Sequence, residues 1–208
     1  MDNLSEIDQE IPVLPEDVPV EMPELPLRRL ISTMQQFKAI SDPVRSRILG
    51  IIQSQPATAR QIADRLGATP GAIGHHLHVL EDAGLAKVVA RRLVRGIVAN
   101  YYTRTAKIFQ YELPEDVRGD NLANLEIMSK AYRELCESHE AYKHDSYRFD
   151  AFPHARLSPE RAKYFSERLE DLLEEILREP PDPHGKVYSI FMAMFLSPPY
   201  MQGQETSE

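Results

Sequence analysis

Residues 58–84 read TARQIADRLGATPGAIGHHLHVLEDAG, and this stretch decides the fold. Thr58 followed three residues later by Gln61 has the form of a capping box, which starts a helix. Thr69 followed by Pro70 predicts a second helix start, because proline at the first helical position loses no hydrogen bond. Each helix is followed by a glycine, the residue that most often ends a helix. The stretch therefore predicts two short helices joined by a tight turn.

The second of these helices, expected over residues 69–83, has two unlike faces. Ile73, Leu77 and Leu80 fall within about 40° of one another at 100° per residue, so they form one apolar stripe. The opposite side carries small residues and residues that can become cationic. These are Gly71, Ala72, Gly74, His75 and His78. Such a helix can bury one face in its own domain and bring the other close to a ligand.

The flanking sequence completes the pattern. Apolar residues at helical spacing predict a helix over 28–40, and Asp42-Pro43 predicts the start of another that ends near Gln53. Downstream, Leu85–Arg91 and Ile97–Thr103 are rich in β-branched and aromatic residues and predict a hairpin with a basic tip. The last three of these four helices, followed by the basic hairpin, predict a winged helix-turn-helix.

Charge divides the 208-residue chain into three parts, although the whole has a net charge of −8. Residues 1–27 hold eight acids, five prolines and no Lys or Arg, which predicts a disordered or extended acidic tail. Residues 28–113 hold thirteen Lys or Arg against five Asp or Glu. Residues 114–208 are acidic again, with nineteen acids against eleven bases. A basic domain between two acidic segments is compatible with a polyanionic partner.

The rest of the chain predicts a small α+β domain after a long helix, so the fold class is mainly α with a small β wing. We expect a helix over 121–144, a strand within 147–157, a helix starting at Ser158-Pro159 and a buried strand over 187–196. The single cysteine, Cys136, excludes an intrachain disulfide, and no apolar stretch suits a membrane helix or a signal peptide. These features favour a cytoplasmic protein.

Three motifs in order resemble a known family: FKAISDPVRSRILGII at 37–52, TARQIADRLGATPGAIGHHLHVLEDAGLAKVV at 58–89 and RGIVANYYTRTA at 95–106. Together they resemble the DNA-binding domain of the ArsR-type winged-helix regulators. The resemblance implies a prokaryotic, dimeric regulator that represses transcription until an effector binds. It also implies a recognition helix at 69–83 in the major groove and a wing at 91–97 on the DNA backbone or minor groove.

The resemblance carries a set of DNA-facing positions, to which the residues themselves add Gly71 and the helix N-termini at Thr58 and Thr69, whose amides suit phosphate. The full set is Thr58, Thr69, Pro70, Gly71, Ala72, Gly74, His75, His78, Arg91, Arg92 and Arg95. Family members often carry Ser, Gln and Arg where this chain has Gly74, Pro70 and His75. We therefore expect methyl contacts and DNA shape to contribute more to specificity than bidentate hydrogen bonds.

Partners and alternatives follow from the same residues. A single module binds DNA weakly, so we expect a homodimer that forms through the helices at 28–40 and 121–144. The dimer would bind an inverted-repeat operator. We also expect a small-molecule or protein effector at the C-terminal domain. One alternative is a winged helix used only for protein–protein contact. Another is a metal- or thiol-responsive sensor that uses Cys136 with His139 and Glu140. The sequence shows no catalytic constellation, and we expect neither enzymatic activity nor a cofactor or metal.

Overall fold

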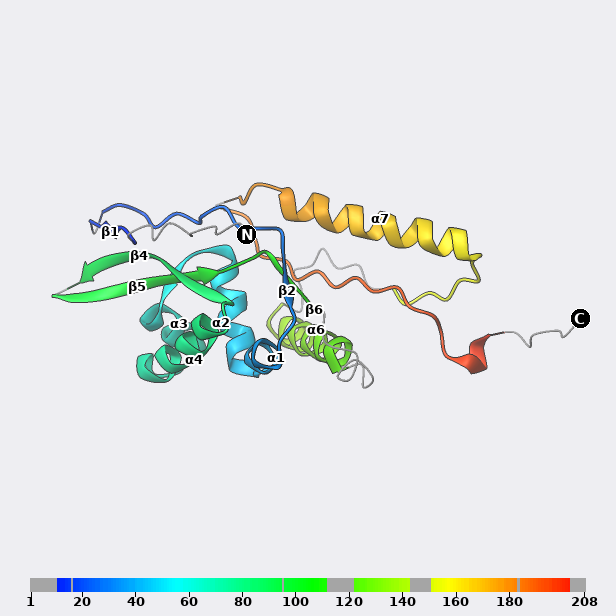
Figure 1. Cartoon of the computed structure of the whole chain (residues 1–208), viewed down its shortest axis with the longest axis horizontal. Coiled ribbons are helices and arrows are strands. Elements are labelled where there is room, and N and C mark those ends of the chain that lie inside the picture. Colours follow the sequence, from blue (N-terminus) through cyan, green and yellow to red (C-terminus); the bar gives the residue numbers. More distant parts are fainter. Residues whose placement is uncertain are drawn as a thin grey trace, which may run out of the picture. The chain divides into compact units, whose positions relative to one another are not determined.

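The computed structural model describes residues 11–15, 17–94, 96–111, 122–142, 151–182 and 184–202 (Figure 1). The chain divides into two compact units, residues 1–126 and 127–208, which we call the first and the second unit. The boundary between them lies within the long helix α6, Leu122–Ala141. The first unit holds the winged helix-turn-helix and the candidate site.

Four helices form the α-helical part of the first unit. Their bounds are α1, Met34–Ile40; α2, Pro43–Ser54; α3, Ala59–Leu66; and α4, Pro70–Asp82. Each begins at a side chain that accepts a hydrogen bond from a backbone amide of the first turn. The expected turn between α3 and α4 is confirmed, and Gly67 caps α3 in the left-handed conformation at φ 62°.

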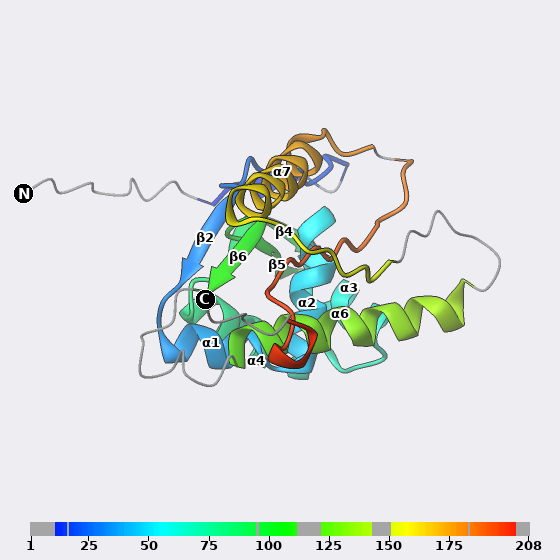
Figure 2. The ribbon, with the colours of Figure 1, turned by 90° about the vertical axis from the view of Figure 1, so that its right-hand side faces the viewer.

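The strands of the first unit form two small sheets. The larger has the order β1-β4-β5-β3, with β1 at Val13–Leu14, β3 at Ala57–Thr58, β4 at Ala86–Val94 and β5 at Ile97–Arg104. The antiparallel pair β4–β5 is the expected hairpin, whose first strand runs three residues further than predicted. In the smaller sheet, β2 (Arg28–Ile31) pairs in parallel with β6 (Ile108–Tyr111), as Figure 2 shows.

The core lies where the four helices meet the sheet. The largest fully buried side chains come from β2, α2, α3, α4, β5 and the segment after α4; they are Ile31, Ile48, Ile52, Ile62, Ile73, Leu77, Leu80, Leu85 and Thr103. All three residues of the apolar stripe predicted on α4 are among them. The orientation of α4 is therefore set by its buried face.

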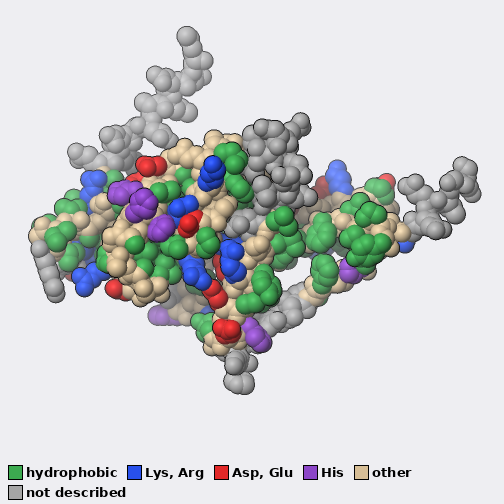
Figure 3. Space-filling model, turned by 90° about the horizontal axis from the view of Figure 1, so that it is seen from below, with side chains coloured by type: hydrophobic (Ala, Val, Ile, Leu, Met, Phe, Trp, Pro, Cys, Tyr) green, Lys and Arg blue, Asp and Glu red, His purple; other side chains and the backbone are tan. Residues whose placement is uncertain are grey.

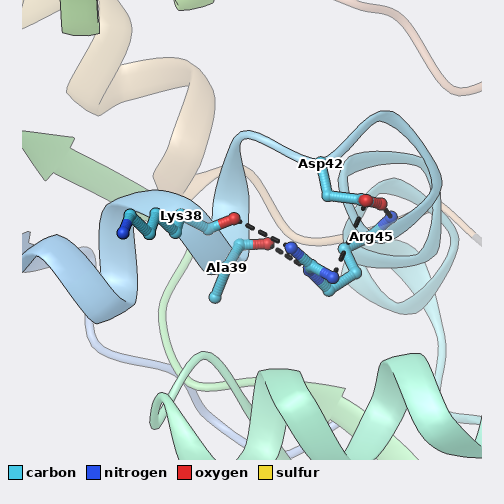
Figure 4. A network of polar contacts seen from close by, with 4 residues as sticks. All are labelled: Lys38, Ala39, Asp42 and Arg45. Atoms are coloured by element: carbon cyan, nitrogen blue, oxygen red, sulfur yellow. Dashed lines mark hydrogen bonds and ion pairs between the residues drawn. The ribbon is translucent and has the colours of Figure 1, made fainter.

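Arg45 fixes the corner between α1 and α2 (Figure 4). Its Nε donates to the Ala39 carbonyl oxygen at 2.6 Å and its Nη2 to that of Lys38 at 2.8 Å. Its backbone amide donates to Oδ1 of Asp42, the N-cap of α2, at 2.9 Å. A guanidinium at the end of α1 satisfies carbonyls that would otherwise lack intrahelical partners.

The prediction of one helix over residues 28–40 is wrong in its first half. Arg28–Ile31 is strand β2, and the helix begins only at Met34. Thr33 and Gln36 form a capping box, in which each side chain accepts a hydrogen bond from the backbone amide of the other residue. This cap starts the helix at Met34, and its signal is present in the sequence as Thr-x-x-Gln. The upstream residues are instead paired with β6.

The tail over residues 1–27 was predicted to be disordered or extended, and its described residues between 11 and 27 are extended. Within them, β1 pairs in parallel with β4. The amide of Arg91 donates to the Pro12 carbonyl at 2.8 Å, and that of Lys107 to the Pro26 carbonyl at 2.9 Å. Pro12 and Pro26 have no N–H, but their carbonyls remain able to accept these bonds.

The second unit contains most of α6 (Leu122–Ala141), α7 (Pro159–Arg178) and a short 3₁₀ turn, η1 (Pro199–Met201). Both helices were predicted, including the Ser158 N-cap of α7. Neither of the two strands expected in this unit, at 147–157 and at 187–196, is formed in the described residues. Residues 151–157 and 187–196 have no paired neighbouring strand, and residues 147–150 lie outside the described chain. An apolar run alone does not make a strand when no sheet is present to bond it.

No residue of α7 is fully buried in the described chain. On the apolar face of this helix, Phe165 and Leu172 are exposed, and the other members are half-buried: Ala162, Leu169, Leu173 and Ile176. No helix in the part of the chain that the structure describes is long and apolar enough to cross a membrane.

Gly67 gives a direct test of the turn. A Cβ at this position would meet no atom within 4 Å, so the cost of a side chain is conformational only. We expect Gly67→Ala to lower the free energy of unfolding by about 1 kcal/mol, because L-residues disfavour the left-handed region. Gly67→Asn should cost less, because asparagine tolerates that region better. Urea unfolding of both variants measures this, and equal stability of Gly67→Ala and the parent chain would contradict the assigned turn.

Candidate nucleic-acid interface

The outer face of α4 is exposed, as its periodicity predicted. Thr69, Pro70, Gly71, Ala72, His75 and His78 are exposed, and Gly74 is half-buried. Histidine side chains gather on this side of the molecule, with Lys and Arg side chains nearby (Figure 3). The sequence singles out these residues one by one, and the structure brings them onto one continuous helix surface.

The N-terminus of α4 leaves one backbone donor open. The Thr69 hydroxyl accepts from the Ala72 amide at 3.3 Å, and Pro70 has no amide hydrogen. Within the described chain, the amide of Gly71 is then the first-turn donor that no contact occupies. Because the helix dipole is positive at this end, the position suits an anion.

Two glycines of α4 are not required by the packing of the protein itself. A Cβ built at Gly71 or at Gly74 would meet no heavy atom within 4 Å. Glycine inside a helix destabilises it by about 1 kcal/mol relative to alanine. The chain thus carries two destabilising residues on the outer face of α4. Because glycine has no side chain, a ligand can approach the helix backbone closely there.

The three histidines of α4 lie in three different environments. His75 is exposed, and its ring centroid lies 5.9 Å from that of His76. His76 is half-buried at the edge of the apolar stripe, where its Nδ1 is buried with no partner among the described residues. His78 is exposed, with Nδ1 3.7 Å from the carboxylate of Glu81. Glu81 is absent from the predicted set of site residues, although its i, i+3 spacing places it beside His78.

No group of three His, Cys, Asp or Glu side chains gathers at metal-binding distances anywhere in the described chain. His75, His76 and His78 belong to one helix, and no described carboxylate or cysteine joins them in such a group. Cys136 is exposed on α6, a helix with no buried residue among those that the structure describes.

Thr58 is not exposed. It is the N-cap of α3 and is buried at 9% exposure, opposite Tyr101 in the pairing of β3 with β5. Its hydroxyl accepts from the Gln61 amide at 3.2 Å, and its own amide donates to Oε1 of Gln61 at 2.9 Å. The hydroxyl is therefore committed to the capping box, and Thr58 acts on the surface only through the helix start that it fixes.

The bases predicted in the wing are described only in part. Arg91 and Arg92 are half-buried, and Arg95 lies outside the described residues. The Arg92 guanidinium stacks over the Tyr101 ring at 5.3 Å, and it donates to the Val18 carbonyl. Large apolar side chains are also exposed near the tip: Leu93, Val94, Ile97 and Val98. The β-branched residues that signalled the strands also form this surface.

Arg104, another base of the wing strands, is buried and faces the domain. Its guanidinium lies 4.5 Å from the Phe109 ring centroid and donates to the Gln53 side chain. Burial lowers the pKa of Arg104 to about 10, still well above neutral pH. One of the thirteen bases counted in the sequence is thus structural.

Comparison with known proteins agrees with this geometry. Residues 40–89, from the end of α1 into β4, match the family described as a helix-turn-helix domain. The transcriptional repressor SdpR of Bacillus subtilis is 43% identical over 47 residues, which are 23% of this chain. Residues 40–89 therefore carry a helix-turn-helix domain. The match spans about half the length of that curated relative, at 52%.

Two solved structures illustrate the likeness, each at a low overall superposition score. One is the winged helix-turn-helix domain Mb0332 from Mycobacterium bovis, described as a homodimeric DNA-binding domain of a possible ArsR-family regulator. It is 18% identical to this chain. The alignment covers 55% of this chain and 85% of that one, with a TM-score of 0.30. The transcriptional regulator HlyU from Vibrio vulnificus is 22% identical, with 50% and 82% covered and a TM-score of 0.29.

The glycines of α4 allow a stability test with a matched control. We expect Gly74→Ala to raise the free energy of unfolding by about 0.5–1 kcal/mol, because alanine has the higher helix propensity and the site is open. Gly50→Ala in α2 should have the same effect, since Gly50 is exposed and an added methyl group would likewise meet no atom within 4 Å. Chemical denaturation measures both. A destabilised Gly74→Ala beside a stabilised Gly50→Ala would show that Gly74 serves packing.

Proposed function

We propose that the first unit binds duplex DNA sequence-specifically and that the chain regulates transcription, as a repressor. The observation that carries this is the division of α4 into a fully buried stripe and an exposed face with two glycines that the fold does not need. A recognition helix requires this arrangement, because one side must hold to its domain while the other enters the major groove.

Composition and relatives support the proposal. The segment 28–113 has thirteen Lys or Arg against five Asp or Glu, within a chain that is acidic overall. Phosphate neutralisation by such residues supplies most of the sequence-independent affinity for DNA. The name of the matched relative, a transcriptional repressor, supports the direction of regulation.

In the proposed complex, residues of the α4 face lie at the bases or the nearby backbone. They are Thr69, Pro70, Gly71, Ala72, Gly74 and His75. His78, Arg91, Arg92 and Arg95 contact phosphates, and Thr58 positions the N-terminus of α3 towards one. Few of the α4 side chains can make bidentate hydrogen bonds to base edges. Methyl contacts, the open amide of Gly71 and DNA shape then determine much of the specificity.

We further propose that the protein acts as a homodimer. The contact would involve α6 together with the region 28–40, which the structure divides into β2 and α1. On α6, Leu125, Met128, Tyr132 and Leu135 are exposed at spacings of three and four residues, as expected for a helix that packs along another. Two-fold symmetry predicts an inverted repeat with half-sites roughly 34–36 Å apart. The second unit is then the place where a small-molecule or protein effector binds.

One observation favours a second function, a winged helix used for protein contact. Near its tip the wing exposes the apolar side chains of Leu93, Ile97 and Val98. Exposed apolar groups of this kind mark protein interfaces more often than phosphate contacts. Under this alternative the outer face of α4 would tolerate change, and affinity for duplex DNA would be negligible. A thiol-responsive regulator using the exposed Cys136 would instead bind DNA only in one oxidation state.

Selection from random duplex fragments at two salt concentrations tests the proposal. We expect the purified chain to enrich an inverted repeat and its affinity to fall steeply with salt, by about 0.9 in log–log slope per phosphate contact. Absence of binding at low salt would contradict the proposal and favour the protein-contact alternative. Salt-dependent binding without enrichment would contradict the sequence-specific part.

The glycine variants connect the outer face of α4 to DNA binding. We expect Gly74→Ala to weaken binding of the selected duplex about tenfold, which corresponds to about 1.4 kcal/mol, because the added methyl group holds the helix away from the groove. Gly50→Ala should bind like the parent chain. Fluorescence anisotropy measures both affinities, and an equal affinity for Gly74→Ala would place DNA elsewhere.

The wing gives an independent prediction. Arg95→Ala should reduce the salt slope by about one, because one phosphate contact is lost, while the selected motif stays the same. Titrations across a range of salt concentrations measure the slope. An unchanged slope would show that Arg95 does not reach the backbone.

A further inference from the structure

The N-terminal arm, which we define as the described residues between 11 and 27, follows the wing closely. Pro12 and Val13 lie beside Arg91, where the Arg91 amide donates to the Pro12 carbonyl. Further along, Val18 accepts a hydrogen bond from the Arg92 guanidinium. Figure 1 shows this part of the chain next to the β4–β5 hairpin. The arm therefore covers the outer edge of the wing.

The base of the arm is anchored more firmly than its outer half. Leu25 is buried at 8% exposure, and the Thr103 hydroxyl lies 3.2 Å from the Met22 sulfur. In contrast, β1 has only two residues, and Val13 is 64% exposed. Short pairing and little burial mark a segment that opens at low free-energy cost. The outer half can thus leave the wing while the part around Leu25 stays in place.

The arm presents negative charge to a surface that would meet DNA. Asp17, Glu21 and Glu24 are exposed, and residues 1–27 contain no Lys or Arg. Arg92, the wing base with the clearest contacts, already gives its guanidinium to the Val18 carbonyl and to the Tyr101 ring. A phosphate at Arg92 would have to replace the first of these bonds and approach against the carboxylates.

From these contacts we infer that the arm is an intramolecular competitor of DNA: its outer half, residues 11–21, occupies the β4 edge and Arg92 and must leave before the wing engages the phosphate backbone. This inference rests on the proposed function of the domain. A tethered segment acts at an effective concentration of about 1 mM or more, so weak pairing is sufficient to lower the apparent affinity. The arm thereby sets a threshold that high-affinity operators exceed and non-specific duplexes do not.

A reversible crosslink tests this in the full-length chain. Val13 and Arg91 are register partners in the parallel pair β1–β4, so cysteines at both positions can form a disulfide that pins the arm. The variant Val13→Cys/Arg91→Cys, with Cys136→Ser, is compared with itself in the reduced and oxidised states. The probe is the duplex selected by the parent chain, or a random duplex at low salt. We expect oxidation to lower DNA affinity at least about fivefold and to reduce the salt slope by about one.

Neutralising the arm tests the opposite direction. Asp17→Asn/Glu21→Gln/Glu24→Gln should raise DNA affinity about threefold to tenfold at low salt, because three negative charges are removed from the arm. A matched variant with three acids of α7 neutralised, Glu167→Gln/Glu170→Gln/Glu174→Gln, makes the same change in net charge. It should raise affinity less than the arm variant does. Circular dichroism verifies that each variant keeps its helices.

The outcomes separate the two proposals. If the parent chain binds DNA but pinning the arm leaves affinity and slope unchanged, the competition is wrong while the DNA-binding function stands. Equal effects of the arm and α7 variants would likewise overturn the competition, since only net charge would matter. If neither redox state nor the parent chain binds any duplex, both proposals fail.

Discussion

Burial of three side chains on one face of α4 is the constraint on which the rest depends. Ile73, Leu77 and Leu80 have no exposed surface. They fix the rotation of the helix about its axis, and this fixes which residues face outward. Since burying one such side chain is worth about 1.5–3 kcal/mol, other rotations of the helix are strongly disfavoured. The exposed face is therefore held rigidly, as recognition of a groove requires.

The sequence was sufficient for those parts of the fold that local chemistry determines. The Thr58–Gln61 capping box, the Thr69-Pro70 start and Gly67 each encode a helix end within a few residues. The helical period of α4 predicted both its buried and its exposed face. Predictions failed where a distant partner decides. Arg28–Ile31 is a strand because it pairs in register with β6, far along the chain, which no local pattern contains.

In the candidate site, too, local pattern predicted some features and missed those that depend on distant contacts. The helical period predicts which positions of α4 are exposed, but it does not predict the burial and the hydrogen-bond partners of the wing bases. Arg92 is predicted to contact phosphate, and in the structure its guanidinium donates to the carbonyl of Val18, 74 positions away in the chain. Thr58 was predicted as part of the interface, and its burial follows from the pairing of β3 with β5. The acidic arm thus changes the interpretation of the wing through contacts that composition alone cannot reveal.

The wing and α4 therefore differ in when they are available to DNA. The face of α4 is built for close approach whether or not the arm is present, whereas the wing becomes available only when the arm leaves it. Hydrogen exchange of the full-length chain, with and without a saturating amount of the selected duplex, tests this division most directly. If α4 enters the groove and the arm leaves the wing, the α4 amides from Gly71 to His78 exchange more slowly and the Arg91 amide exchanges faster as β1 detaches. Unchanged exchange of the α4 amides would contradict the proposed contact between α4 and DNA, even if DNA changed exchange elsewhere in the protein.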